Sequence, residues 1–175
     1  MKVILVSGKA QHGKDTTAGF LYEKLTADGN RVIITHYADL LKYICKEYFG
    51  WDGNKDEHGR EILQHVGTDV IRKQQPSFWV DFIISLLTLF KEEWDYVIIP
   101  DCRFPNEVNR MKDTFDTIHL RVKRTNFISP LTEEQQMHPS ETALDDFKPD
   151  FWVVNDSDKE SLQRKVNLWI KDILY

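Results

Sequence analysis

The chain has 175 residues, of which 41% are hydrophobic and 29% are charged, and its 23 basic and 28 acidic residues give a net charge of −5. This composition excludes disorder for the bulk of the chain, and the length favours one domain over residues 1–175. A nucleic-acid-binding domain usually carries a basic surplus or stripe, which this sequence lacks. We therefore expect no nucleic-acid partner.

Cysteine usage and the first residues indicate the compartment. Cys45 and Cys102 lie far apart and form no CxxC pair, as is usual in a reducing environment, and Cys102 is interpreted as a small buried residue. The apolar run Val3–Val6 is too short for a signal sequence or a membrane span. The sequence predicts a cytoplasmic protein with no membrane contact.

Strands and helices are predicted to alternate along the chain. The predicted strands cover residues 2–7, 31–37, 95–100, 117–122 and 151–155. The predicted helices cover residues 13–26, 39–50, 60–73, 78–94, 105–112 and 159–174, with a glycine-rich loop over 50–59. Strands that are apolar throughout and alternate with helices predict an α/β fold with a central parallel sheet of about five strands and helices on both faces.

Residues 124–148 form a polar, irregular stretch. A stretch of this length inside a compact domain is usually a functional lid or disordered. Arg121, Lys123 and Arg124 lie at its start, and cations that close over a phosphate suit a lid. A solvated charge cluster is the alternative interpretation of these residues.

A phosphate-binding loop is predicted between the first strand and the first helix. Residues 8–14 read Gly-Lys-Ala-Gln-His-Gly-Lys and match GxxxxGK. Glycines let successive N–H groups point at phosphate oxygens, and the helix N-terminus adds partial positive charge. Lys14 can then reach the β- and γ-phosphates, whereas His12 is expected to offer only its backbone N–H. The alternative is a glycine-containing turn with an exposed lysine.

The residue after the motif lysine departs from the usual pattern. Asp15 stands where Ser or Thr usually follows the lysine, and Thr16 comes one place later. Asp15 could engage Mg²⁺ through water or only complement the helix dipole, and Thr16 could take the ligand role.

A second acidic position follows the apolar strand Val97–Pro100. Asp101 is predicted at the carboxyl end of that strand, where it could anchor Mg²⁺ or merely cap the next turn. Arg103 follows two residues later and could clamp a second phosphate, or form a salt bridge with Glu107. His138 and Glu141, in His-Pro-Ser-Glu, could suggest a metal site, but two ligands without a third favour surface polarity.

Several motifs in order resemble the phage-type deoxynucleoside monophosphate kinases. They are SGKAQHGKDTTA at 7–18, YADLLK at 37–42, LQHVGTDVIR at 63–72, FWVD at 78–81, IIPDCRFPNEV at 98–108 and HPSE at 138–141. The resemblance spans almost the whole chain. It implies a P-loop kinase fold of three layers with a lid, ATP with Mg²⁺ as donor, a deoxynucleoside 5′-monophosphate as acceptor, and a plausible homodimer.

The resemblance also implies roles for individual residues. The nucleotide would be held by Gly8, Ala10, Gln11, His12, Gly13, Lys14, Asp15, Thr16, Thr17 and Arg121, and the metal by Asp15, Thr16 and Asp101. The acceptor would meet Asp39, Lys42, Arg72, Trp79, Arg103 and Glu141. Lys14, Arg103 and Arg124 would serve catalysis. Trp79 and Phe78 could stack a base or be core residues of their helix.

Other functions stay open at this stage. The animal-type phosphomevalonate kinases share a similar GKD loop and basic lid, so the acceptor could be another phosphorylated small molecule. A nucleotide-dependent regulatory module is a second alternative. A kinase of polynucleotide ends fits poorly with the net charge of −5.

Overall fold

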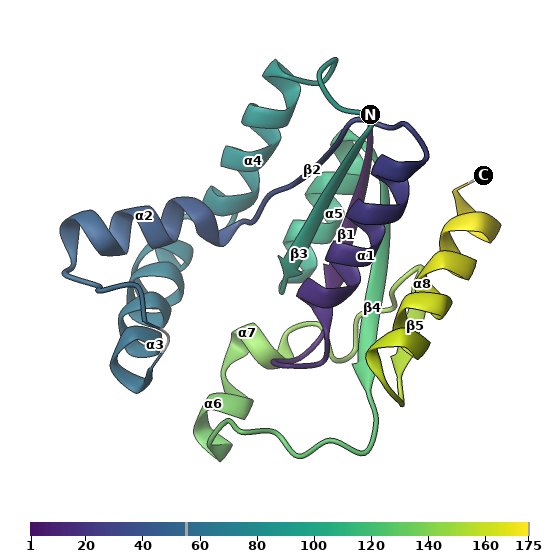
Figure 1. The fold of residues 1–175 in the computed structure, drawn as a ribbon. Coiled ribbons are helices and arrows are strands. Elements are labelled where there is room, and N and C mark those ends of the chain that lie inside the picture. The colour runs from purple at the N-terminus through teal and green to yellow at the C-terminus, as the bar shows by residue number, and fades with distance from the viewer. Residues whose placement is uncertain (55, 175) are drawn as a thin grey trace. The chain divides into compact units, whose positions relative to one another are not determined.

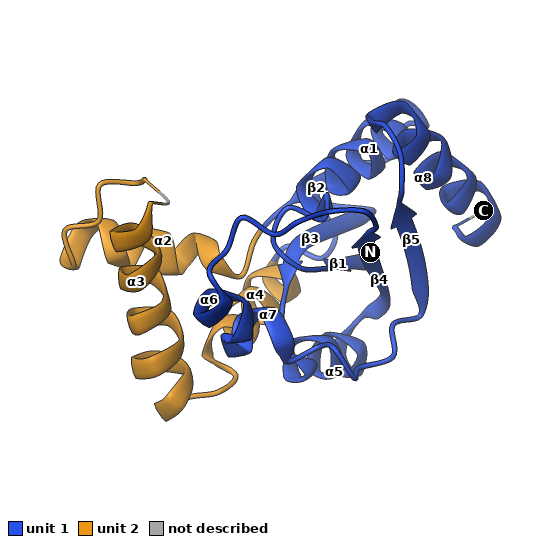
Figure 2. Ribbon diagram, turned by 90° about the horizontal axis from the view of Figure 1, so that it is seen from below, with its two compact units in different colours: residues 1–35, 90–175 blue, residues 36–89 orange. Residues whose placement is uncertain are grey.

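A computed structural model describes residues 1–54 and 56–174. Lys55, inside the loop predicted over 50–59, lies outside the described residues. The chain divides into two compact units, residues 1–35 with 90–175 and residues 36–89 (Figure 2). The prediction of one domain over residues 1–175 stays a prediction.

The first unit is built on a parallel sheet. Its strands are β1 (Lys2–Ser7), β2 (Val32–Ile34), β3 (Tyr96–Cys102), β4 (Asp116–Arg124) and β5 (Phe151–Asn155). Their order across the sheet is β2-β3-β1-β4-β5, and every neighbouring pair is parallel. Its helices are α1 (Lys14–Ala27), α5 (Pro105–Thr114), α6 (Glu133–Met137), α7 (Pro139–Thr142) and α8 (Lys159–Ile173). Five parallel strands confirm the predicted α/β class.

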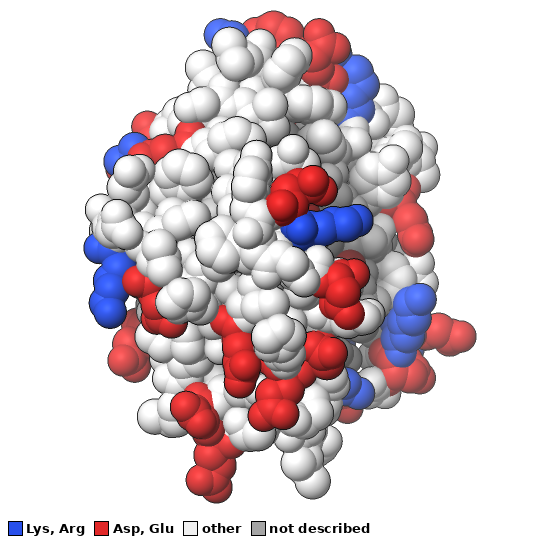
Figure 3. All heavy atoms as spheres, turned by 90° about the vertical axis from the view of Figure 1, so that its left-hand side faces the viewer, with Lys and Arg blue, Asp and Glu red and all other residues white. Residues whose placement is uncertain are grey.

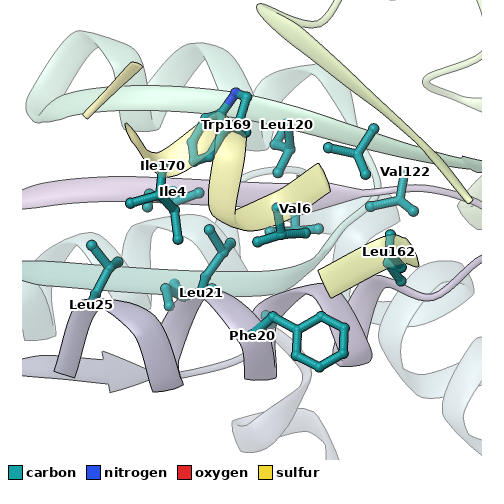
Figure 4. Close-up of a cluster of buried hydrophobic side chains, with 14 residues drawn as sticks. Ile4, Val6, Phe20, Leu21, Leu25, Leu120, Val122, Leu162, Trp169 and Ile170 are labelled. Atoms are coloured by element: carbon teal, nitrogen blue, oxygen red, sulfur yellow. The ribbon is translucent and has the colours of Figure 1, made fainter. Parts of the chain in front are cut away.

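Helices cover both faces of this sheet. Figures 1 and 2 show α1 and α8 on one face and α5 on the other. The larger core lies under α1 and α8, where Ile4 and Val6 from the central strand meet Leu21 and Ile170 from the two helices (Figure 4). All four side chains are fully buried. Truncating Ile4, Leu21 or Ile170 to alanine would cost about 2–5 kcal/mol, so this core stabilises the strand that leads into the phosphate loop.

The second unit, residues 36–89, is helical. It contains α2 (Ala38–Tyr48), α3 (Glu57–Gln64), the π-helix η1 (His65–Arg72) and α4 (Phe78–Leu89). Buried Cys45, Trp51 and Val66 form one hydrophobic cluster in this unit. Asp56 is the N-cap of α3, and its carboxylate accepts a hydrogen bond from the Gly59 N–H at 2.8 Å.

Several boundaries differ from the prediction. The helix predicted over residues 60–73 begins earlier, at Glu57, and changes to π register after Gln64. The helix predicted over 78–94 ends at Leu89, and a hydrogen-bonded turn follows. Among the strands, β4 extends to Arg124 because β5 pairs with it as far as Arg124 and Asn155. The edge strand β2 is shorter than predicted, since it pairs only with β3.

The stretch predicted as an irregular lid has two parts. The exposed half, residues 125–137, contains α6, which buries no residue. The anchored half, residues 138–148, contains α7 and the buried Leu144. No helix among the described residues is both long and apolar enough to cross a membrane.

Candidate functional site: a phosphate loop at the carboxyl edge of the sheet

The loop between β1 and α1 requires glycine at both motif positions. Gly8 has φ +149°, and a Cβ there would lie 2.5 Å from the Val122 carbonyl oxygen. Gly13 precedes α1 with φ +102°, and its Cβ would lie 3.0 Å from the Asn155 amide nitrogen. A side chain at either position would be strained and would push the loop away from β4 or β5. The GxxxxGK spacing therefore fits a loop held tightly against the sheet.

Lys14 folds back over this loop. Its Nζ donates to the Lys9 carbonyl at 2.9 Å, and the His12 N–H donates to the same oxygen at 3.2 Å. Burial lowers the pKa of Lys14 to about 8, and the Arg103 charge acts in the same direction. Glu141 and Asp15 oppose that shift. The His12 N–H, expected to serve a phosphate, is thus used within the loop.

A cavity of 340 Å³ opens beside the loop. It is lined by Gln11, Gly13, Lys14, Asp15, Thr16, Arg124, Asn155, Ser157, Lys159 and Leu162. The cavity combines the start of α1 with the carboxyl ends of β4 and β5 and the start of α8. In an open parallel sheet this edge is where ligands bind.

Of the two arginines on β4, only Arg124 lines the cavity. Its guanidinium lies 4.7 Å from the centre of the Phe127 ring, and its backbone N–H donates to His12 Nδ1 at 3.3 Å. Burial lowers the pKa of His12, so this ring nitrogen can accept as a neutral imidazole. Arg121 instead is buried and donates to Asp145 at 2.8 Å and to the Leu144 carbonyl. Arg121 therefore holds the anchored half on the sheet.

The oxygen donors expected for Mg²⁺ lie on two elements. Asp15 and Thr16 are in the first turn of α1 and line the cavity. Asp101 lies within β3, which runs one residue beyond it, and its charge acts on Lys14. Carboxylate and hydroxyl oxygens suit Mg²⁺, which usually takes one or two protein carboxylates together with phosphate oxygens. Thr17 is different, because its side chain is fully buried and its hydroxyl has no hydrogen-bond partner within the described chain.

Arg103 is fixed at its backbone and at its side chain. Its backbone N–H donates to the Glu107 carboxylate at 2.7 Å. Its guanidinium pairs with Glu141 and donates to the Ser140 carbonyl at 3.0 Å. The guanidinium is thus bound by Glu141 rather than by the neighbouring Glu107 that the sequence suggested.

Glu141 is not a surface residue. Its side chain is 8% exposed, and Oε2 accepts a hydrogen bond from the Ala10 N–H at 2.8 Å. His138 caps α7 through Nδ1, which accepts from the Ser140 N–H at 3.2 Å. The described residues contain no group of three metal-ligating side chains. The surface-polarity interpretation of Glu141 was therefore wrong, because long-range contacts decide its burial.

The remaining acceptor candidates belong to the helical unit. Lys42 forms an ion pair with Asp39 at 2.9 Å. Burial alone would raise the pKa of Asp39, but the pairing with Lys42 and the neighbouring His36 lower it overall. Arg72 donates to the Pro76 carbonyl at 3.3 Å. Trp79 is 3% exposed and its indole N–H donates to the Gly67 carbonyl at 3.1 Å. This burial favours a core role for Trp79 over base stacking.

Sequence reasoning missed the cavity residues at the end of β5 and directly after it. Asn155, Ser157 and Lys159 line the cavity, and the Asn155 amide donates to the His12 carbonyl at 3.2 Å. Asn155 ends an apolar strand, so the strand-end rule that identified Asp101 could also have identified it.

The fold and the loop place this chain among the P-loop kinases, and its activity is that of a phosphotransferase. The chain belongs to the deoxynucleotide monophosphate kinase family, whose model matches residues 35–166. Two curated proteins with kinase names are similar to this chain in sequence. Phosphomevalonate kinase of Drosophila melanogaster is 24% identical, with 96% of this chain and 94% of that one covered. Deoxynucleotide monophosphate kinase of Enterobacteria phage T4 is 25% identical, with 64% and 45% covered.

Solved structures support the same fold. Mycobacterium tuberculosis APS kinase CysC, in complex with AMPPNP and APS, has a TM-score of 0.52 at 12% identity, with 97% of each chain covered. Shikimate kinase from Aquifex aeolicus has a TM-score of 0.51 at 14% identity, with 98% of this chain and 97% of that one covered.

Proposed function

We propose that this protein transfers the γ-phosphoryl group of ATP to a deoxynucleoside 5′-monophosphate. The observation that carries the proposal is the phosphate loop, in which Lys14 and the first turn of α1 border a cavity at the carboxyl edge of the sheet. Membership of the deoxynucleotide monophosphate kinase family supports this class of acceptor. A monophosphate is already an anionic nucleophile, so the protein needs to position two phosphates and offset their charge rather than supply a strong base.

Donor binding is assigned to the loop and the cavity. The start of α1 directs N–H groups and partial positive charge toward the β- and γ-phosphates, and Lys14 adds a cation. Arg124 lines the same cavity and would serve the donor nucleotide or the transferred phosphoryl group. Arg121 and Thr17, both buried, would support β4 and α1 from beneath.

Mg²⁺ would neutralise charge on the donor phosphates, and Asp15, Thr16 and Asp101 are the residues proposed to hold it. Asp101→Asn keeps the size of the side chain but removes its charge. We expect the variant to need about tenfold more Mg²⁺ for half-maximal turnover, which a Mg²⁺ titration at saturating ATP measures. An unchanged titration curve with normal turnover would show that Asp101 is only a structural residue of β3.

Acceptor binding is assigned to Arg103 and to Asp39, Lys42 and Arg72 of the helical unit. Arginine binds phosphate through parallel N–H donors, which makes Arg103 and Arg72 the principal candidates. In the view of Figure 3, acidic side chains are spread widely, with isolated basic ones among them. The net charge of −5 suits a small acceptor better than a polynucleotide.

A phosphomevalonate-type acceptor is the second candidate. It is favoured by the extent of the Drosophila match, which covers 96% of this chain against 64% for the phage T4 enzyme. Both kinds of acceptor present a phosphate to the same cations, so the loop itself does not distinguish them.

One experiment decides between the two acceptors. ADP formation is measured with the four deoxynucleoside monophosphates, the ribonucleoside monophosphates and phosphomevalonate, each at matched concentration. We expect turnover with at least one deoxynucleoside monophosphate and loss of that turnover in Lys14→Ala. Turnover with phosphomevalonate alone would replace the proposed acceptor, and turnover with no member of the panel would contradict both.

A further inference from the structure

The contact between the anchored half and the phosphate loop is unexplained by the proposed roles. The turn His138–Glu141 is stabilised by local features, because His138 caps α7 and Pro139 occupies its first position. Proline there loses no helical hydrogen bond and has a backbone angle that suits the first turn. This turn presents Glu141, whose side chain is only 8% exposed.

Glu141 bridges two groups of the proposed site. Oε2 accepts from the Ala10 N–H at 2.8 Å, while Oε1 pairs with the Arg103 Nη1. Ala10 belongs to the phosphate loop, and Arg103 follows the end of β3. One carboxylate therefore connects the loop to the arginine that is proposed to clamp a phosphate.

The bridge restricts the direction of the Arg103 side chain. The contacts that the guanidinium makes with Glu141 and with the Ser140 carbonyl both involve Nη1. Nε and Nη2 carry N–H groups that these two contacts do not use. Since Glu107 holds the backbone of Arg103 at 2.7 Å, the residue is fixed at both ends. A long side chain held in this way loses less conformational entropy when it binds a phosphate.

A second bridge offers a matched comparison. Asp145 pairs with Lys9 at 2.9 Å and with Arg121 at 2.8 Å. It also ties the anchored half to the loop, but through Lys9 and Arg121 rather than through Arg103. Its carboxylate is 38% exposed.

We propose that Glu141 is a positioning residue, which directs the Arg103 guanidinium toward the phosphates and holds it at a fixed position relative to the phosphate loop. The inference rests on the proposed function, because it assigns Glu141 an effect that passes through Arg103. Asp145 shares the task of anchoring the segment but does not direct Arg103.

A double-mutant cycle tests the proposal. Glu141→Gln keeps an oxygen for the Ala10 N–H and removes the charge that holds Arg103. We expect this substitution to lower kcat/KM about tenfold or more in the otherwise native protein, and by less than about twofold in the Arg103→Ala background. Asp145→Asn, the matched control, should lower kcat/KM by the same factor in both backgrounds.

The outcomes separate the proposal from a purely structural role. An equal effect of Glu141→Gln in both backgrounds, or no effect in either, would overturn it. Thermal unfolding and the affinity for ADP, measured by calorimetry, should change little in Glu141→Gln. If that variant does not fold, Glu141→Asp, which keeps the charge on a shorter side chain, replaces it in the same cycle. Native turnover in Arg103→Ala would instead contradict the proposed function of Arg103.

Discussion

The exposed half and the anchored half of residues 125–148 have similar polar sequences but different physical environments. Ile128 is 92% exposed and Met137 is 75% exposed, and α6 buries nothing. The anchored half buries Leu144 and is joined to the loop through Glu141 and Asp145. Segments with few buried contacts open at low free energy, whereas anchored ones open with the core. We therefore expect the exposed half to open more readily than the anchored half.

The largest effect is expected at the loop on which the anchored half rests. Lys14→Ala removes the cation proposed to meet the donor phosphates. Turnover should fall by about a hundredfold or more, since such stabilisation is typically worth a few kcal/mol at the transition state. Steady-state assays measure the loss, and far-ultraviolet circular dichroism checks that the fold is kept. Turnover within about tenfold of the native protein would remove Lys14 from the mechanism.

A matched pair of aliphatic truncations compares the two halves directly. Leu144→Ala should reduce the free energy of unfolding by about 2–4 kcal/mol, because Leu144 is 5% exposed. Ile128→Ala should change it by less than about 0.5 kcal/mol, because Ile128 is 92% exposed. Urea unfolding measures both values. Equal values would mean that the two halves are not held differently.

Lowering the pH should reduce the free energy of unfolding, because β4 carries a buried histidine. His119 is fully buried, its Nε2 lies 2.7 Å from Ser7 Oγ, and its ring lies 5.7 Å from that of Phe147. Burial lowers the pKa of His119 to about 4, whereas an unfolded histidine has a pKa near 6.5. Between these values the unfolded chain binds a proton that the folded chain does not. Stability due to His119 is therefore present above about pH 6.5 and is lost as the pH falls towards 4.

We expect that loss to reach about 2–3 kcal/mol. Urea unfolding at about pH 7 and about pH 4.5 measures it, with His119→Asn as a control that keeps a polar side chain without titrating. The control should lose less stability on acidification than the native protein. The same loss in both proteins would assign the effect to carboxylates.

The smallest effect is expected for Arg72, and it tests whether acceptor binding also depends on the helical unit. Arg72→Ala should raise the acceptor KM about tenfold and leave the ATP KM nearly unchanged, as expected for one charge-assisted phosphate contact. Measuring both KM values in one assay gives the comparison. Equal shifts for ATP and acceptor, or no shift in either, would leave Arg103 as the principal acceptor arginine.

Local patterns predicted the phosphate loop well. Two glycines, a lysine, an apolar strand before them and a helix after them specify the loop without long-range information. The structure shows why the glycines are needed, since Gly8 and Gly13 both have positive φ and both approach neighbouring strands closely.

The alternation of side chains between the two faces of a strand could also have distinguished the role of Arg124 from that of Arg121. Arg124 lies on the face of β4 that carries Leu120 and Val122, which belong to the core under α1 and α8. Arg121 is an odd number of residues away from Arg124, so its side chain points to the opposite face. Because the cavity is built from the starts of α1 and α8, period-2 reasoning favours Arg124 there.

Other features depend on contacts that local patterns do not contain. The hydrogen bonds that Ala10 donates to Glu141 and that Lys9 donates to Asp145 join residues more than a hundred positions apart. The π register of η1 is also not visible in the local sequence, because its surroundings include long-range contacts. A Cβ at Gly67 would lie 2.6 Å from Leu41, and the Gly67 carbonyl accepts a hydrogen bond from Trp79. Helical periodicity predicts that this stretch is a helix but does not predict its hydrogen-bond register.

The two cysteines give each compact unit its own reporter of transient opening. Cys45 is buried in the helical unit and Cys102 in β3 of the sheet unit. Burial raises the pKa of both thiols, and for Cys102 the nearby Glu107 and Asp101 raise it further. Because the thiolate is the reactive form, an alkylating reagent reacts with either site only when the surrounding structure opens. Peptide-resolved alkylation rates would therefore measure the opening free energy of each unit separately within a single unmodified chain.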